Sequence, residues 1–182
     1  VYRTLDDDQL FDAVADALAE EIGADTVPLI AFEGMLTHEV RGRRRGKVQV
    51  YGVDARFWAF HGVADPELSG RGAALTPSLM EELGSTSGDS LLLRVEQPST
   101  VSRGSLHGLK KNNGRTIRLT QEAAVAREFS LYPQQDSVKA IFLPLSRLQS
   151  DLGQEGGVNT ILLSFRSESG DAETRLQETA TL

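Results

Sequence analysis

Residues 74–95 read Ala-Leu-Thr-Pro-Ser-Leu-Met-Glu-Glu-Leu-Gly-Ser-Thr-Ser-Gly-Asp-Ser-Leu-Leu-Leu-Arg-Val, which predicts a short helix, a tight turn and a buried strand. Thr76 is a suitable N-cap, and Pro77 falls at the first helical position, where its missing N–H costs nothing. Gly84 can adopt the left-handed conformation that commonly ends a helix. No side chain in this stretch is placed for chemistry, so we interpret the stretch as scaffold.

The second half of the stretch joins the predicted helix to the predicted strand. Gly88 and Asp89 indicate a turn, and the apolar run 91–95 indicates a buried strand. Residues 84–88, Gly-Ser-Thr-Ser-Gly, have the glycine spacing of a nucleophile elbow but carry Thr at the centre. They also lie between a helix and a strand, which is the reverse of the order that an elbow requires. We therefore exclude a nucleophile elbow and keep the helix stop and the turn.

Composition narrows the class of protein. The chain has 182 residues, a net charge of −7 and no cysteine. This length allows one domain or two small lobes, and the acidic balance argues against non-specific binding to nucleic acid. The missing cysteines exclude disulfides and thiolate metal sites, and no apolar run is long enough to span a bilayer. The first residue is valine and no signal peptide is visible, so we expect the chain to be part of a longer protein.

The first third of the chain predicts one long helix and two strands. Helical spacing of apolar residues predicts a helix over residues 6–22, which Gly23 would end. An apolar run predicts a strand over 27–32, and alternation predicts another over 47–53. Residues 65–72 are polar and rich in glycine, so they predict a loop.

The second half of the chain adds strands and a short helix. Ser146 predicts the N-cap of a helix that follows Pro144. Helices and strands alternate without a regular β-α-β rhythm, which favours an α+β fold over a doubly wound parallel sheet. Further strands are expected over residues 116–119, 123–129, 138–143 and 158–165.

No motif in the sequence predicts a catalytic, cofactor-binding or metal site. His38-Glu39 begins like a zinc-protease helix, but Gly42 stands where the second histidine would have to be, so we expect His38 to face solvent. Gly70 and Gly72 begin like a dinucleotide fingerprint, but the third glycine is missing and the motif precedes a strand. Carboxylates that converge only in three dimensions keep an enzyme open as an alternative.

The most basic segment is residues 41–47, Arg-Gly-Arg-Arg-Arg-Gly-Lys, in a chain that is acidic overall. A solvated loop accounts for this segment. The alternative is a docking patch for an acidic partner or for anionic lipid headgroups, because each basic residue near a charged membrane contributes about 1 kcal/mol. The candidate contact residues are the five cations Arg41, Arg43, Arg44, Arg45 and Lys47.

An aromatic cluster follows the strand predicted over 47–53. Phe57, Trp58 and Phe60 lie within four residues of one another. Packing in the core explains such a cluster, and the alternative is an apolar ligand pocket or contact surface. These three side chains are therefore the candidates for an apolar contact.

Several segments, taken in order, resemble MacB/FtsX-type ABC transporter permeases. Residues 50–60 are similar to the "V-x-G-V-D-x-x-F" segment of the extracytoplasmic region of that family. Residues 142–149 and 158–163 are similar to its closing "v-f-v-p-L-x-x-L-Q" and "v-N-x-i-l-v" strands. Within 74–95, the residues that match the family's "L-a-x-x-L-G-x-x-x-G-D" segment are Leu79, Leu83, Gly84, Gly88 and Asp89. The resemblance extends over about residues 48–165.

The resemblance implies a two-lobed α+β periplasmic domain, of which residues 1–182 form a single extracytoplasmic fragment. Residues 1–68 and 136–182 would form a porter-like α/β lobe. Residues 69–135 would form a smaller β-rich lobe inserted between them.

The resemblance also implies a non-enzymatic role at the outer or periplasmic face of the bacterial inner membrane, within an integral membrane protein. Such a domain couples ATP-driven transmembrane motion to an envelope partner or an exported substrate, a form of mechanotransmission. The ATP-binding subunit is cytoplasmic and acts through the transmembrane helices, and the full-length protein can be a homodimer. No cofactor, metal or nucleic acid is implied. The alternative is a periplasmic module that binds an apolar or peptide ligand beside the aromatic cluster.

Overall fold

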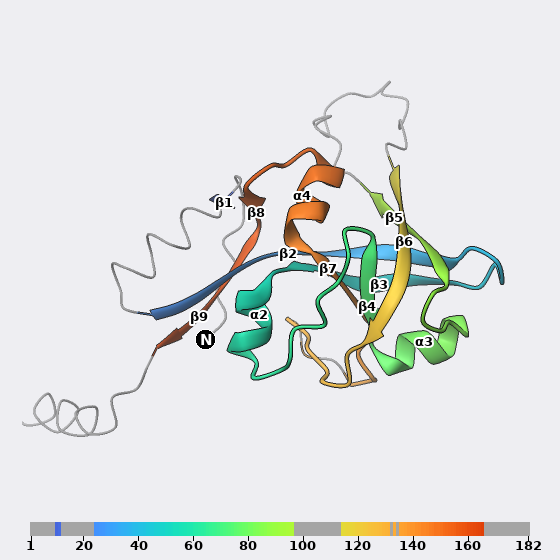
Figure 1. Ribbon diagram of the computed structural model, residues 1–182, viewed down its shortest axis with the longest axis horizontal. Coiled ribbons are helices and arrows are strands. Elements are labelled where there is room, and N and C mark those ends of the chain that lie inside the picture. Colours follow the sequence, from blue (N-terminus) through green and yellow to red (C-terminus); the bar gives the residue numbers. More distant parts are fainter. Residues whose placement is uncertain (1–9, 12–23, 97–113, 132, 134, 166–182) are drawn as a thin grey trace, which may run out of the picture.

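The computed structural model describes residues 10–11, 24–96, 114–131, 133 and 135–165 (Figure 1). No helix within these residues is long and apolar enough to cross a membrane. The described elements are β1 (Leu10–Phe11), β2 (Ala24–His38), β3 (Arg44–Val53), α2 (Ala55–Phe60), β4 (Gly72–Leu75), α3 (Pro77–Leu83), β5 (Ser90–Glu96), β6 (Gly114–Ala124), β7 (Ala140–Pro144), α4 (Leu145–Leu152), β8 (Gly157–Val158) and β9 (Thr160–Phe165).

Strand β2 organises the sheet because it pairs with three other strands. Its residues 24–29 pair antiparallel with β9, residues 30–37 pair with β3, and residues 35–38 pair with β5. The sheet order is β3-β7-β4-β6-β5-β2-β9, and the additional pairing of β3 with β2 closes six strands into a ring. Each of those six strands therefore has a hydrogen-bonded neighbour on both sides, which removes the free edges that promote aggregation.

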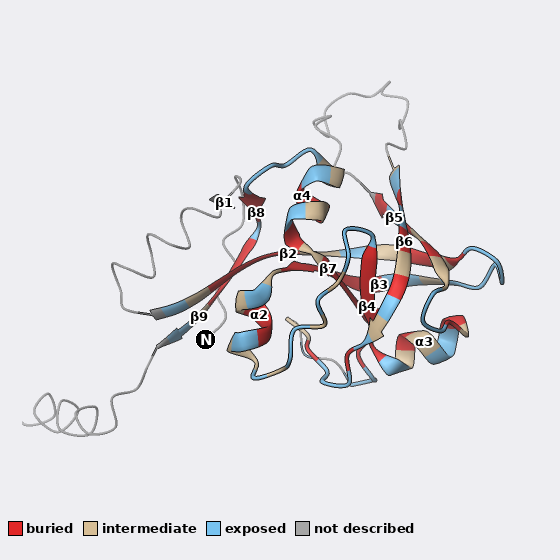
Figure 2. Ribbon diagram, in the orientation of Figure 1, coloured by how far each residue is buried: buried red, intermediate tan, exposed pale blue. Residues whose placement is uncertain are grey.

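Side-chain alternation along β3 and β7 separates two hydrophobic cores. Val50 and Ile141 belong to the first core, which contains residues from all six strands of the ring. Their neighbours Tyr51 and Phe142 belong to the second core, on the other face of the same strands. Helices α3 and α4 pack against the first core, whereas α2 covers the second, and Figure 2 shows the buried faces of these elements in red.

The helix and strand predicted from residues 74–95 are confirmed as α3 and β5. Thr76 precedes the helix and Pro77 begins it, but the Thr76 hydroxyl does not cap the helix. It accepts a hydrogen bond from the Ala140 N–H at 3.1 Å and so ties the start of α3 to β7. Gly84 ends the helix in the left-handed conformation (φ 65°, ψ 35°).

Asn159 extends the pairing of β9 with β2 by one residue. Its side-chain Oδ1 accepts from the Ala31 N–H, and its Nδ2 donates to the Ala31 carbonyl, both at 2.8 Å. The amide thus supplies the hydrogen bonds of a strand neighbour just beyond Leu29↔Thr160, the last register pair of β2 with β9. This contact gives a physical reason for asparagine at this position of the closing segment.

One predicted strand needs correction, and one predicted helix lies largely outside the described residues. The helix expected over 6–22 falls there except for Leu10 and Phe11, which pair with β8 as strand β1 rather than forming a helix. Of the strand expected over 123–129, only Ala123 and Ala124 are in a strand, as the end of β6, because the partner strand β4 ends opposite at Leu75. The chain beyond Ala124 packs irregularly in the second core.

The helix predicted near Ser146 forms, but its N-cap lies two residues earlier than predicted. Pro144 is the N-cap of α4, with extended backbone angles (φ −57°, ψ 128°), and Leu145 is the first helical residue. Ser146 is exposed and does not cap the helix. The strands predicted over 27–32, 47–53 and 91–95 are confirmed within β2, β3 and β5.

The mixture of helices and strands confirms the α+β class. Strand β4, which begins in the expected inserted lobe, pairs with β7 of the expected porter-like lobe. The two expected lobes therefore share one sheet. Their boundaries, 1–68 with 136–182 on one side and 69–135 on the other, stay a prediction.

Candidate functional site

The five predicted cations lie on the hairpin that joins β2 to β3, at one end of the molecule (Figure 1). Val40 is at the tip of this hairpin. It is 86 % exposed, and among the described residues it is the one large hydrophobic side chain that is exposed. Figure 2 shows the tip in the colour of exposed residues. The exposed cations are Arg41, Arg43, Arg44 and Lys47, and Arg45 is half-buried.

His38 fixes the base of the hairpin tip, and the expectation that it faces solvent is wrong. It is 1 % exposed, because it lies on the same face of β2 as Leu36 and points inward. Its Nδ1 accepts a hydrogen bond from the Arg41 N–H at 3.3 Å, which assigns the ring proton to Nε2. Nε2 then donates to Asp89 Oδ2 at 3.2 Å.

Asp89 lies in the turn between α3 and β5 and is held by two neighbouring donors as well as by His38. The Thr86 N–H donates to Asp89 Oδ2 at 2.8 Å, and the Thr86 hydroxyl donates to it at 3.1 Å. These Thr86 contacts, followed by the contact with His38, lower the pKa of the Asp89 carboxyl. The hairpin tip is thereby attached to the turn through an ionised carboxylate.

Arg45 differs from the other cations of the hairpin because it already forms an ion pair with a carboxylate of the protein. Its Nη1 lies 2.8 Å from Glu82 Oε1 on α3, and Lys139 Nζ lies 3.5 Å from Glu82 Oε2. The charge of Arg45 is therefore already paired within the protein. Its place in the candidate set stays a prediction, as does that of the other four cations.

Two of the hairpin guanidinium groups gather at the end of α3. A Cβ atom placed on Gly84 would lie 2.9 Å from Arg43 Nη1 and 3.6 Å from Arg41 Nη1. Cations near the C-terminus of a helix face the negative end of its dipole, which favours them. The absence of a side chain at Gly84 thus leaves room for the guanidinium groups of Arg41 and Arg43 beside this short stretch of backbone.

The aromatic cluster packs mainly inside the protein. Phe57 and Trp58 are 2 % and 4 % exposed, and Phe60 is half-buried against the same core. Phe57 lies edge-on to Trp58, with ring centroids 5.1 Å apart. The cavity among these rings is only about 20 Å³, close to the space of a single water probe. Phe57 therefore serves the core and leaves no room for a ligand beside it.

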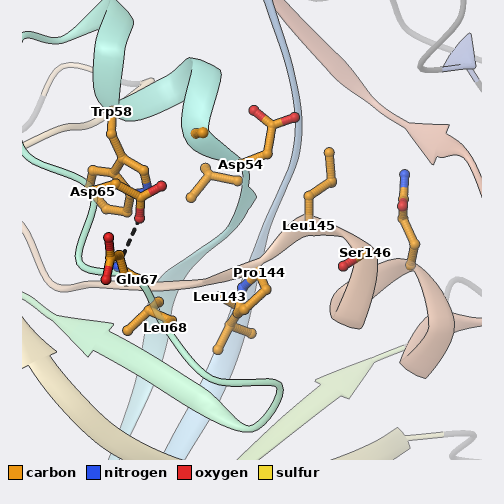
Figure 3. Close-up of a pocket in the computed structure, with 12 residues that line it drawn as sticks. Asp54, Trp58, Asp65, Glu67, Leu68, Leu143, Pro144, Leu145 and Ser146 are labelled. Carbon is orange, nitrogen blue, oxygen red and sulfur yellow. Dashed lines mark hydrogen bonds between the residues drawn. The ribbon is translucent and has the colours of Figure 1, made fainter.

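A larger cleft lies on the other side of Trp58, between α2 and the start of α4 (Figure 3). Its volume is ≈ 280 Å³, and its lining mixes apolar side chains with the carboxylates of Asp54, Asp65 and Glu67. Asp54 is engaged by Arg56, and Asp65 Oδ1 accepts from the Glu67 N–H at 2.9 Å. The carboxylates of Asp54 and Asp65 thus accept hydrogen bonds from the backbone N–H groups of Arg56 and Glu67. No cluster of metal-ligating side chains occurs within the described residues.

Sequence reasoning missed three residues of the hairpin site. His38 could have been placed inward by the period-two pattern that it shares with Leu36. Asp89 was identified only as part of a turn, because its contact with His38 spans 51 residues of sequence. Val40 carries no signal of its own, since its exposure follows from its position at the hairpin tip.

The fold resembles solved extracytoplasmic domains of ABC transporters. The periplasmic region of MacB from Actinobacillus actinomycetemcomitans superposes with a TM-score of 0.55 at 13% sequence identity, over 95% of this chain and 74% of that one. The extracellular domain of the noncanonic ABC-type transporter YknZ from Gram-positive bacteria gives a TM-score of 0.59 at 11% identity, over 98% of this chain and 91% of that one.

Comparison of sequences alone finds no such relative. No family model matches the chain, and no curated protein matches it. The structural likeness confirms the resemblance seen in the sequence at the level of the fold. The chain thus has the fold of a MacB-like extracytoplasmic domain of an ABC transporter.

Proposed function

We propose that this chain is a non-catalytic extracytoplasmic domain of an ABC transporter permease. The domain couples ATP-driven movement of transmembrane helices to an envelope partner or an exported substrate. The observation that carries the proposal is the likeness to two transporter domains over nearly the whole chain. The proposed location is the outer or periplasmic face of the bacterial inner membrane, as part of an integral membrane protein.

The architecture suits a part that moves as a rigid unit. β2 runs from Ala24, which pairs with Phe165 of β9, to His38 at the base of the hairpin tip. Movement applied at the Ala24 end would reach the tip through continuous backbone hydrogen bonds. The closed ring resists shear between strands, because each member is paired on both sides.

The proposed partners are of three kinds. A cytoplasmic ATP-binding subunit acts indirectly, through the transmembrane helices of the permease. A second copy of the permease forms a homodimer, and an envelope protein or exported substrate is engaged on the outside. Nucleic acid is not among them, because the net charge of −7 opposes it.

A labelled transporter tests the coupling. The 182-residue chain contains no cysteine, so Val40→Cys gives this domain a single attachment point for an environment-sensitive dye. In the reconstituted parent permease, otherwise free of cysteine, ATP turnover should change the dye signal reversibly. A label placed by Arg94→Cys, on β5 away from the tip, should report the same cycle. No ATP-dependent change at either position would contradict the coupling, and intrinsic hydrolase or transferase activity would contradict the non-catalytic role.

The cleft beside Trp58 supports a second candidate function, a module that binds an apolar or peptide ligand. Its volume, ≈ 280 Å³, lies near the lower limit for small-molecule sites. Trp58 is the single tryptophan of the chain, so tryptophan fluorescence reports on the surroundings of a residue that lines this cleft. A saturable change with a fatty acid or short peptide would favour the module, and an unchanged spectrum would favour the transporter role.

A further inference from the structure

We infer that the tip of the β2–β3 hairpin docks an acidic segment of a protein partner. The docking tip consists of Val40, Arg41, Arg43 and Arg44, all of them exposed. The inference deepens the proposed function, on which it rests for the orientation of the domain, and names the chemistry of the partner.

The charges of the docking tip are available. No described residue forms an ion pair with Arg41, Arg43 or Arg44, whereas Arg45 shares Glu82 with Lys139. Glu39, which adjoins the tip in the sequence, is engaged by Arg118 of β6. Three guanidinium groups at one end of an acidic protein therefore lack an ion-pair partner among the described residues. Two of them, Arg41 and Arg43, lie near the C-terminal end of α3, and together the three create a local positive potential.

The docking tip is also held in place before any partner arrives. Buried His38 joins the tip backbone at Arg41 to Asp89 in the turn that precedes β5. The Glu39 N–H donates to the Ser90 carbonyl at 3.0 Å, a second link between the hairpin and β5. A preorganised loop loses less conformational entropy on binding than a free one.

The residue types fit a protein interface. Arginine presents a planar fork that binds a carboxylate through two hydrogen bonds, and it is enriched at interfaces, unlike lysine. Val40 adds an apolar contact among the cations. This pattern suits a segment in which glutamate or aspartate alternates with apolar side chains.

The position of the docking tip favours a protein over a lipid surface. Ala24 and Phe165 are register partners at the end of β2 opposite the hairpin (Figure 1). β2 has 15 residues and spans up to roughly 45 Å at the usual strand rise. In a domain tethered through β2 and β9, this length would separate the tip from the lipid headgroups. Their field decays over about 8 Å at physiological ionic strength.

Binding of a fluorescent poly-glutamate peptide to the 182-residue chain, followed by anisotropy, tests the inference. The wild type should bind saturably and more weakly as salt rises. R41Q/R43Q/R44Q should weaken binding about tenfold, the sum of three modest exposed ion pairs. The control R71Q/R94Q/R115Q removes the same charge from exposed arginines outside the docking tip and should change the affinity less than about twofold.

Two further variants separate charge, geometry and apolar contact. R41K/R43K/R44K keeps the charge and the fold but loses the fork, so it should lie between the wild type and the glutamine variant. V40S should weaken an alternating Glu-Leu peptide while leaving poly-glutamate unaffected. Failure of V40S to do so would remove Val40 from the docking tip.

Three results would overturn the inference. They are no binding of poly-glutamate by the wild type, equal weakening by the test and control triples, and binding through these arginines to phosphatidylglycerol vesicles but not to poly-glutamate. The last result would assign the surface to a lipid membrane. None of these measurements involves ATP, so their failure is distinct from failure of the coupling experiment.

Discussion

His38 Nε2 lies 3.2 Å from Asp89 Oδ2, which joins the β2–β3 hairpin to the turn before β5. This contact links a residue buried to 1 % exposure with a partly exposed carboxylate. It determines how the exposed end of the hairpin is attached to the rest of the protein.

Removal of the His38 side chain should loosen that attachment. His38→Ala leaves the Arg41 N–H without its acceptor and opens a cavity, so we expect a loss of about 1–3 kcal/mol in the free energy of unfolding. Urea denaturation measures the loss. Asp89→Asn keeps an acceptor oxygen for Thr86 and His38 and should cost less. An equal or larger loss for the asparagine variant would contradict this account.

His61 should make stability sensitive to mild acid. Burial and then the charge of Arg127 lower its pKa in the folded protein. The unfolded chain therefore binds the proton first, and the free energy of unfolding falls as the pH drops through about 6.5, the ordinary histidine value. His61→Phe keeps the ring packing against Phe57 and Phe129 and removes this term.

Urea unfolding of the wild type and His61→Phe near pH 8 and pH 5 compares the two. The variant should lose less stability on acidification than the wild type does. His61 Nε2 is buried without a hydrogen-bond partner among the described residues, so the substitution should not lower stability at the higher pH. Parallel pH profiles for the two proteins would show that His61 titrates alike in both states.

Alanine substitutions at Gly84 and Gly42 can be compared, because the two glycines have similar backbone angles and differ in what an added side chain would contact. Both adopt positive φ, 65° and 68°, where alanine is strained by about 1 kcal/mol. A Cβ on Gly84 would also meet Arg43 Nη1, whereas a Cβ on Gly42 would meet nothing within 4 Å. We expect both alanine variants to lose about 1 kcal/mol, because the end of a flexible arginine can move aside. A much larger loss for Gly84→Ala would show that Arg43 is held rigidly.

Asn159 should be sensitive to the loss of its amide nitrogen. Asn159→Asp keeps the acceptor for the Ala31 N–H but turns a donor into an oxygen facing the Ala31 carbonyl. The expected loss in the free energy of unfolding is about 1–2 kcal/mol, measured by urea denaturation at neutral pH. Protonation of the new aspartate should restore part of it in acid. A loss that does not depend on pH would contradict the assignment of the effect to the contact between this side chain and the Ala31 carbonyl.

Local patterns predicted those parts of the fold that depend on nearby residues. The alternation of Val48 and Val50 identified β3, and Gly84 identified the end of α3. The contact of Arg45 with Glu82 spans 37 residues, and it exists because α3 lies beside the hairpin. Spacing along the chain carries no information about such a neighbour, which is why all five cations looked equivalent.

The ring of strands shows the same limit. β2 reads as an ordinary apolar run, yet it pairs with β3, β5 and β9 along successive parts of its length. The sequence predicted a strand over 27–32, whereas the structure extends it to His38 because neighbours on both sides supply hydrogen bonds. The aromatic cluster shows a related limit. The sequence offered burial in the core and an apolar pocket as alternatives, and it could not show that Trp58 belongs to the core and also lines a cleft.

The pairing of β2 with β9 constrains the order in which this protein can fold during its synthesis. Ala31 and Asn159 are 128 residues apart, and contacts between such distant positions form slowly. During synthesis, the first half of β2 must wait for β9, and until then it is an unpaired apolar strand open to other chains. Premature release of the chain before β9 would leave that half permanently exposed. Synthesis of the six residues of β9 thus determines when this edge of β2 is covered and no longer open to pairing with other chains.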